Sequence, residues 1–175
     1  MPGGGGSGPD HWHTCWEAGN KNVQRVIQAD WNDGTREDWV TALDEYVSMS
    51  NDPVILVAHS LGCILVSHCA ETHRGHVLGA LMVAPADIEG PWVPSGSLYE
   101  RFKPIPLNRF PFATTIVAST NDPYLTPDRA EKFSVSWGSR LEFVGPLEHI
   151  GSEARLHNWV EGWHILERLL ERVSD

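Results

Sequence analysis

A serine stands at the centre of the stretch VILVAHSLGCILVSHC, where an apolar run gives way to a helix-like pattern. A serine hydroxyl is a weak nucleophile unless a base takes its proton and the backbone presents its oxygen to the substrate. A sharp strand-to-helix turn presents the oxygen, and it crowds the residues two before and two after the serine, so both must be small. Ala58 and Gly62 meet this requirement. The sequence therefore predicts that Ser60 is a nucleophile rather than an ordinary turn residue.

The base should be a histidine on a loop that follows a later strand. Among the nine histidines, only His149, in VGPLEHIGS, follows the last strand-like segment and precedes the last helix-like one. His157 and His164 fall within the predicted terminal helix, where a surface or core role is the default interpretation. We therefore assign the base to His149.

A carboxylate must fix the imidazole tautomer and stabilise the imidazolium. Asp122, in IVASTNDPY, follows a strand-like run and precedes a proline that stiffens its loop. Asp87, in MVAPAD, likewise follows a strand-like run, one strand earlier. The alternative role of Asp87 is to cap a turn or a helix. The chain order Ser, Asp, His suits both. We favour Asp122.

The elements that position these residues alternate between strand-like and helix-like patterns. Residues 23–29 alternate with period two, and residues 54–58, 78–84, 114–119 and 141–144 are further strand-like runs. Thr35 and Asp38 have the spacing of a capping box that opens a helix. Pro127 should open another helix toward Trp137, and residues 154–173 carry one apolar stripe at helical spacing.

This alternation predicts an α/β fold, with a mostly parallel sheet and helices on both faces. The 175 residues contain no repeat or linker that would divide them, so we expect a single domain over residues 1–175. Ligands of such sheets bind beyond the carboxyl ends of the strands. Ser60, Asp122 and His149 all lie on loops of that kind.

Composition excludes several other classes of protein. A net charge of −10 and a pI near 5.3 argue against nucleic acid as a partner. No apolar run approaches the roughly 20 residues of a membrane helix, and the N-terminus lacks the regions of a signal peptide. We therefore expect a cytoplasmic protein with no membrane partner and no cofactor. Its three cysteines, an odd number, should be reduced.

At these residues the chain resembles the α/β-hydrolase superfamily, and more narrowly the small serine hydrolases related to retinoblastoma-binding protein nine and the bacterial YdeN-type proteins. The stretches that carry the resemblance are SGPDHWHTCWE, QADW, VAHSLGC, FPFATTIVASTNDPY and LEHIGS, which span nearly the whole chain. The resemblance implies a compact hydrolase with a minimal lid and a catalytic triad of Ser60, Asp122 and His149. It also implies that the oxyanion is bound by the backbone N–H of Leu61 and by one near Gly4 or Gly5.

The sequence departs from that family at two places. Glu148 stands before His149, where relatives usually have glycine, so the loop that carries the base could take another shape. Only Met1 and Pro2 precede the glycine run, so the first strand of the fold is apparently missing. We therefore expect either that the native chain begins further upstream, or that residues 23–29 and 54–58 form strands separated by about two strand spacings, near 9.5 Å.

Other interpretations of the same residues are weaker. The glycine run could bind phosphate, but no strand precedes it and no Gly-Lys-Ser/Thr signature follows. It could instead be a linker, although it continues directly into the stretch SGPDHW, which carries the family resemblance. His11, His13 and Cys15 alternate as metal ligands would, but a fourth ligand at a suitable spacing is missing, so we assign no metal site. Residues 89–112, rich in proline and aromatic side chains, could line the substrate pocket or form an irregular surface loop.

The sequence thus predicts a serine hydrolase that cleaves small carboxylic esters through an acyl-enzyme. The alternatives are an amide or aminoacyl hydrolase of the aminopeptidase type and a weakly active interaction module on a hydrolase fold. Its partner should be a small ester or amide substrate. A protein partner is also possible, but the sequence does not identify one.

Overall fold

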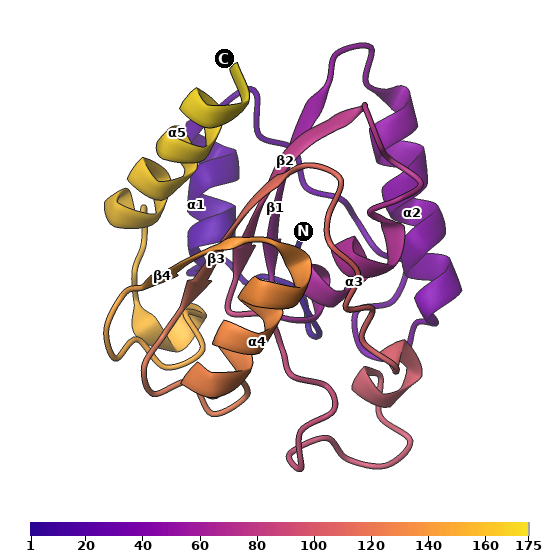
Figure 1. Cartoon of the computed structure of the whole chain (residues 1–175), viewed down its shortest axis with the longest axis vertical. Coiled ribbons are helices and arrows are strands. Elements are labelled where there is room, and N and C mark those ends of the chain that lie inside the picture. The colour runs from indigo at the N-terminus through magenta and orange to yellow at the C-terminus, as the bar shows by residue number, and fades with distance from the viewer. Residues whose placement is uncertain (175) are drawn as a thin grey trace.

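A single parallel sheet forms the centre of the computed structural model, which describes residues 1–174 (Figure 1). Its strands follow the order β1 (Val54–His59), β2 (Val77–Val83), β3 (Ala113–Ala118) and β4 (Arg140–Phe143). All three pairings are parallel, and the register places Met82 beside Ala58 on one side and Ile116 on the other. The carboxyl ends of the strands therefore share one edge.

Within residues 1–174, five α-helices cover both faces of the sheet (Figure 1). One face is covered by α1 (Trp12–Gly19) and α5 (Val160–Ser174), and the other by α2 (Arg36–Met49), α3 (Leu61–Cys69) and α4 (Pro127–Trp137). Two short 3-10 helices, η1 (Tyr99–Phe102) and η2 (Ser152–Ala154), lie in the loops. This is the predicted α/β architecture.

The hydrophobic core is divided by the sheet into two clusters. In β2, Ala80 and Met82 face the cluster under α2, α3 and α4, whereas Leu81 and Val83 face the cluster that contains Trp12 and Trp16. Because the strand is buried on both faces, its sequence is continuously apolar rather than alternating.

Local signals in the sequence give most of the boundaries correctly. The four predicted strands at 54–58, 78–84, 114–119 and 141–144 each agree with the structure within one residue at either end. Thr35 and Asp38 form the predicted capping box of α2. Pro127 opens α4, and Gly138 ends it in the left-handed conformation with φ 70°. These predictions are confirmed.

The predicted strand at residues 23–29 is wrong. No ladder hydrogen bond joins this segment to β1 within residues 1–174, and it carries no strand. The position beside β1 is taken by Met1, whose amino group donates to the Val57 carbonyl at 2.6 Å and whose carbonyl accepts from the His59 N–H at 3.0 Å. The period-two pattern reflects one-sided burial of Val26 and Gln28 without strand pairing. Since residues 23–29 are no strand, the expected gap between two strands does not arise.

The terminal helix begins later than predicted. Residues 154–159 precede α5, and Arg155, His157 and Trp159 have positive φ values of 48°, 50° and 33°. Trp159 packs in the core cluster that contains Trp12 and Trp16, and its ring lies 5.0 Å from that of Trp12. The backbone of Gly162 lies against the Trp159 indole. The apolar residues of the predicted stripe are therefore directed toward the core, but those before residue 160 lie in a loop rather than in the helix. His157 also lies outside the helix.

Candidate active site

Ser60 sits in a strained turn between β1 and α3. Its backbone has φ 57° and ψ −125°, a conformation that residues with a side chain rarely adopt and that persists only where the surroundings enforce it. The Ser60 N–H donates to the Val83 carbonyl at 3.0 Å, which ties the turn to β2. A Cβ at Gly62 would lie 2.6 Å from the Met1 carbonyl oxygen, so only glycine fits beside the first residues of the chain. The turn therefore has the form that a presented nucleophile requires.

The structure brings Ser60, His149 and Asp122 into one hydrogen-bonded row. His149 Nε2 lies 2.8 Å from Ser60 Oγ, and His149 Nδ1 lies 2.8 Å and 3.0 Å from the two carboxylate oxygens of Asp122. The Asp122 side chain is fully buried. A carboxylate accepts the Nδ1–H, which leaves the Nε2 lone pair to accept the serine proton. The arrangement can therefore activate the Ser60 hydroxyl.

The alternative acid, Asp87, lies elsewhere in the hydrogen-bond network. Arg129 in α4 binds both of its oxygens, with distances of 2.7 Å from Nε and 2.6 Å from Nη2. The same guanidinium also donates to Glu89 at 3.0 Å. Asp87 thus anchors α4 to the loop that follows β2.

The backbone on both sides of His149 is held in the left-handed region. Glu148 has φ 51° and Ile150 has φ 52°. His59 Nε2 lies 2.8 Å from the His149 carbonyl oxygen, and the ring of Tyr124 meets the His149 ring edge to face at 4.7 Å. Burial lowers the pKa of His59 well below its usual value, so His59 is neutral and donates a single N–H to that carbonyl. These contacts fix the position of the imidazole.

Asn121 and Glu148 form a reciprocal pair that the sequence analysis did not identify as part of the site. Asn121 Nδ2 donates to Glu148 Oε1 at 2.7 Å, and the Glu148 N–H donates to Asn121 Oδ1 at 2.8 Å. Ser119 adds to this link, because its hydroxyl oxygen accepts the Leu147 N–H at 2.9 Å and its proton goes to Asn121 Oδ1 at 2.8 Å. The loop of the acid is thereby bonded to the loop of the base. The only signal in the sequence was the unusual Glu148 before the histidine.

The backbone N–H groups expected to bind an oxyanion differ in their surroundings. Leu61 is the first residue of α3, so its N–H has no acceptor within the helix. The Gly5 N–H already donates to the Trp31 carbonyl at 2.9 Å, whereas the Gly4 N–H has no backbone acceptor among residues 1–174. A Cβ at Gly3 would lie 3.0 Å from both Leu61 N and Ser60 Oγ, so Gly3 borders the space in front of the nucleophile. Neither the spacing nor the family resemblance had indicated this role of Gly3.

Aromatic side chains extend from His149 along the glycine-rich loop. Tyr124, Trp92 and Tyr99 contact one another in succession, with ring centroids 4.7 Å and 4.9 Å apart. Residues 89–112 thus contribute Trp92 and Tyr99 to this aromatic row, while Phe102 is buried in the core. Beside the row, a pocket of about 240 Å³ is lined by the following residues: Gly4, Gly5, Trp31, Asn32, Asp33, Gly96, Ser97, Leu98 and Tyr99.

Two of the three candidate metal ligands, His11 and His13, lie side by side, but within the described residues they do not form a larger group of ligands. His11 and His13 stack at 5.0 Å near the start of α1, and within residues 1–174 no three His, Cys, Asp or Glu side chains are grouped as metal ligands would be. Cys15, Cys63 and Cys69 are free thiols. Within the same range, no helix is both long and apolar enough to cross a bilayer.

The fold and the geometry around Ser60 are those of an α/β hydrolase. A model of the serine hydrolase family matches residues 1–168, which is nearly the full length, and the chain belongs to this family. No curated protein sequence matches the chain significantly.

Solved structures agree with this assignment. A YdeN-like hydrolase from Pectobacterium atrosepticum superposes with a TM-score of 0.88 at 29% identity, covering 99% of this chain and 89% of that one. The ydeN gene product of B. subtilis gives a TM-score of 0.74 at 15% identity, covering 97% and 96% of the two chains. Mouse α/β hydrolase domain-containing protein 10 gives 0.67 at 16% identity, with 99% and 88% covered. The last two similarities are evidence for the fold alone.

Proposed function

We propose that this serine hydrolase cleaves small carboxylic esters through an acyl-enzyme formed on Ser60. The observation that carries the proposal is the row of hydrogen bonds from Ser60 Oγ to His149 Nε2 at 2.8 Å and from His149 Nδ1 to Asp122 at 2.8 Å. Both distances are those of a nucleophile bonded to its base and of a base bonded to its orienting acid.

In the first half of the reaction, Ser60 Oγ attacks the ester carbonyl carbon while its proton moves to His149 Nε2. The carbonyl oxygen becomes an oxyanion, which the N–H groups of Leu61 and Gly4 stabilise. His149 then gives the proton to the alcohol oxygen as the carbon–oxygen bond breaks, and the acyl group stays on Ser60. Asp122 keeps its negative charge throughout and stabilises the imidazolium.

In the second half, water attacks the acyl-enzyme. His149 takes one proton from the water as its oxygen bonds to the acyl carbon, and then returns that proton to Ser60 Oγ as the ester bond to the serine breaks. The products are a carboxylic acid and the free enzyme. No redox partner or cofactor enters the balance.

The surroundings of the nucleophile favour small acyl groups. Gly3 lies against Ser60, and a Cβ at Gly4 would lie 2.7 Å from the Tyr99 hydroxyl, so the glycine loop leaves little room on that side. The aromatic row of Tyr99, Trp92 and Tyr124 offers an apolar surface. Asp33, which lines the adjoining pocket, is ion-paired with Arg101 rather than free to bind the amino terminus of a peptide. These features support an ester of a small acid over an aminopeptidase substrate.

An active-site-directed fluorophosphonate and a panel of esters and aminoacyl amides test the proposal. The wild type should label and should hydrolyse short-chain p-nitrophenyl esters, while Ser60→Ala should do neither and should keep its melting temperature. Ser48→Ala, on the exposed side of α2, is the matched control and should behave as the wild type. Labelling of Ser60→Ala at the wild-type rate would remove Ser60 from the mechanism. Faster turnover of aminoacyl amides than of esters would show that the substrates are amides instead of esters. If the wild type is not labelled, the protein would be an interaction module rather than an enzyme.

A further inference from the structure

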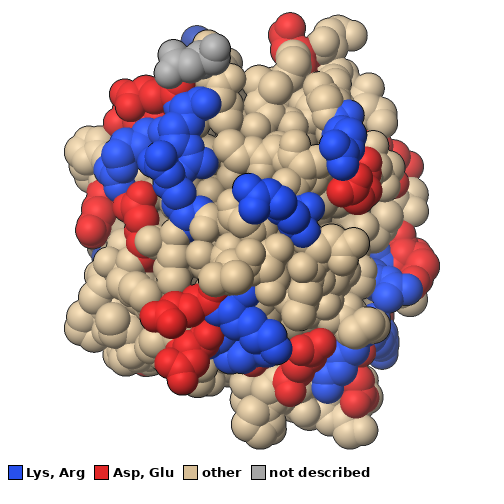
Figure 2. Space-filling view, viewed as in Figure 1, with Lys and Arg blue, Asp and Glu red and all other residues tan. Residues whose placement is uncertain are grey.

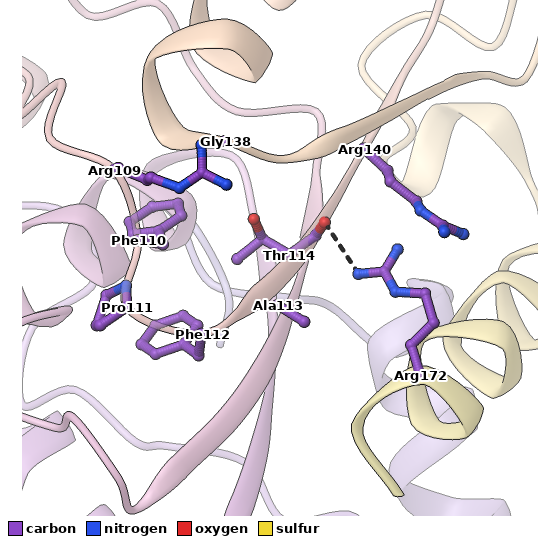
Figure 3. A pocket seen from close by; sticks show the side chains of 9 residues that line it. All are labelled: Arg109, Phe110, Pro111, Phe112, Ala113, Thr114, Gly138, Arg140 and Arg172. Atoms are coloured by element: carbon purple, nitrogen blue, oxygen red, sulfur yellow. Dashed lines mark hydrogen bonds between the residues drawn. The ribbon is translucent and has the colours of Figure 1, made fainter. Parts of the chain in front are cut away.

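A second pocket lies at the edge of the sheet opposite to Ser60. Its volume is about 400 Å³, within the size range of small-molecule sites. It is lined by Arg109, Phe110, Pro111, Phe112, Ala113, Thr114, Gly138, Arg140 and Arg172. We call it the arginine pocket (Figure 3). Ala113 begins β3 and Arg140 begins β4, so the pocket lies at the amino ends of these strands, away from the catalytic edge.

Within residues 1–174, the three arginines of this pocket form no ion pair with a carboxylate, although the protein is strongly acidic. The chain has 23 acidic residues and 10 arginines. Within residues 1–174, six of the arginines form ion pairs with carboxylates: Arg25, Arg36, Arg74, Arg101, Arg129 and Arg168. Three of the remaining four line the arginine pocket, and the fourth is Arg155. The pocket therefore collects arginines without an ion-paired carboxylate, and Figure 2 shows basic side chains with acidic ones beside them over α5 on this face.

The guanidinium groups are positioned by the surrounding structure. Arg172 donates to the Thr114 carbonyl and to the Thr115 hydroxyl, both at 3.4 Å. Arg109 lies against Gly138, where an added Cβ would come within 2.8 Å of the guanidinium carbon. Figure 3 shows Arg109 on one side of Thr114, and Arg140 and Arg172 next to each other on the other side.

Two of these like charges lie close enough to oppose each other. Burial and the neighbouring positive charge of Arg140 lower the pKa of Arg172, and the negative charge of Glu142 opposes this shift only in part. Such a pair is stabilised when an anion lies between or beside the two guanidinium groups, because each presents a planar fork that matches carboxylate or phosphate oxygens.

We propose that the arginine pocket binds a small organic ligand with two oxyanionic groups, either phosphates or carboxylates. One group would be bound by Arg140 and Arg172 together, and the other by Arg109. The rings of Phe110 and Phe112 stack on each other with centroids 5.6 Å apart. They would contact the apolar part of the ligand that joins its two oxyanionic groups.

Calorimetric titration at constant ionic strength tests the site, with inorganic pyrophosphate and succinate as the two probes. We expect one ligand per chain, with a Kd at least tenfold weaker in Arg140→Gln and in Arg109→Gln, because each loses a charge-assisted hydrogen bond. Arg155→Gln is the matched control, since it removes the same charge outside the pocket, and its Kd should stay within twofold of the wild type. Tighter binding of pyrophosphate indicates phosphate ligands, and tighter binding of succinate indicates carboxylate ligands.

Two results would overturn the proposal: no binding of either probe at 10 mM, or equal weakening by Arg155→Gln and Arg140→Gln. Esterase activity of the pocket variants shows that each is folded, because none of these arginines contacts Ser60, His149 or Asp122. Arg172→Lys, which keeps the charge but not the fork, should weaken binding less than Arg172→Gln.

Discussion

At the scale of single residues, the site depends on geometry that each side chain receives from its neighbours. His149 is bonded at Nδ1, at Nε2 and through its own carbonyl, and each bond goes to a different part of the chain: Asp122, Ser60 and His59. The base therefore has one ring position and one tautomer. Changes to any of these partners should alter the rate of catalysis more than the fold.

Asp122→Asn should lower kcat by about 10⁴-fold, as the equivalent change does in serine proteases, because the amide favours the wrong imidazole tautomer. Steady-state ester hydrolysis measures the loss. A decrease of less than tenfold would show that Asp122 does not orient the base.

Asn121→Ala should lower kcat about tenfold and leave KM within twofold. The substitution removes both hydrogen bonds to Glu148, so the loop of His149 loses its link to the loop of Asp122 while the substrate pocket stays intact. Asn51→Ala, at an exposed loop position, is the control and should have no effect. A change confined to KM would assign Asn121 to substrate binding instead.

Glu148 itself can be examined by two substitutions. Both Glu148→Ala and Glu148→Gly lose the side-chain bond, but only glycine adopts φ 51° without steric cost. Glu148→Ala should therefore be less stable than Glu148→Gly by about 1–2 kcal/mol in urea unfolding. Equal stabilities would show that the backbone relaxes when the bond to Asn121 is lost.

At the scale of elements, α4 is joined to the end of β2 by the ion pair of Arg129 and Asp87. The pair is bidentate and mostly buried, with side-chain exposures of 22% and 11%, so solvent screens it less than a surface pair. The hydrogen bonds from Arg129 to Asp87 raise the pKa of the guanidinium. This contact positions α4, and within residues 1–174 neither side chain is hydrogen-bonded to Ser60, Asp122 or His149.

Asp87→Asn should lower the free energy of unfolding by about 1–3 kcal/mol and leave kcat within twofold, because Arg129 loses its charged partner. The exposed pair of Asp33 and Arg101 provides the comparison, and Asp33→Asn should cost less than about 1 kcal/mol. Urea unfolding and ester hydrolysis of both variants measure the two effects. A large loss of kcat in Asp87→Asn would move the catalytic acid one strand earlier.

At the scale of the whole molecule, three histidines buried beside the site should make the protein sensitive to acid. Burial lowers the pKa of His11 to about 4 and those of His13 and His59 well below the usual value. In the unfolded chain these groups bind protons near pH 6.5, whereas in the folded protein they remain neutral to lower pH. The contribution of these histidines to stability is therefore complete above pH 6.5 and decreases as the pH falls toward 4.

Urea unfolding between pH 7 and pH 4.5 should show this loss. His11 alone accounts for about 3 kcal/mol over the full interval, since one pKa unit corresponds to about 1.4 kcal/mol. His11→Gln should flatten the dependence on pH, whereas His164→Gln, at an exposed position of α5, should leave it unchanged. A free energy of unfolding that is constant across this range would contradict the burial of neutral histidines.

The sequence by itself determined the elements whose formation depends on nearby residues. The apolar run before Ser60 and the box of Thr35 and Asp38 act within one strand or one helical turn, so their patterns predict the structure directly. The loop positions of Asp122 and His149 followed from the same alternation, because parallel strands place their exits at one edge.

Only the tertiary structure decided the features that depend on distant neighbours. Residues 23–29 had the pattern of a strand but found no partner to pair with, because Met1 lies beside β1 instead. The segment before α5 left its helical pattern because Trp159 packs on Trp12 and Trp16, which lie more than 140 residues earlier. The bond between Asn121 and Glu148 and the gathering of three arginines likewise join segments distant in sequence. Hydrogen bonding and burial act through space, and a pattern along the chain does not record which segments they bring together.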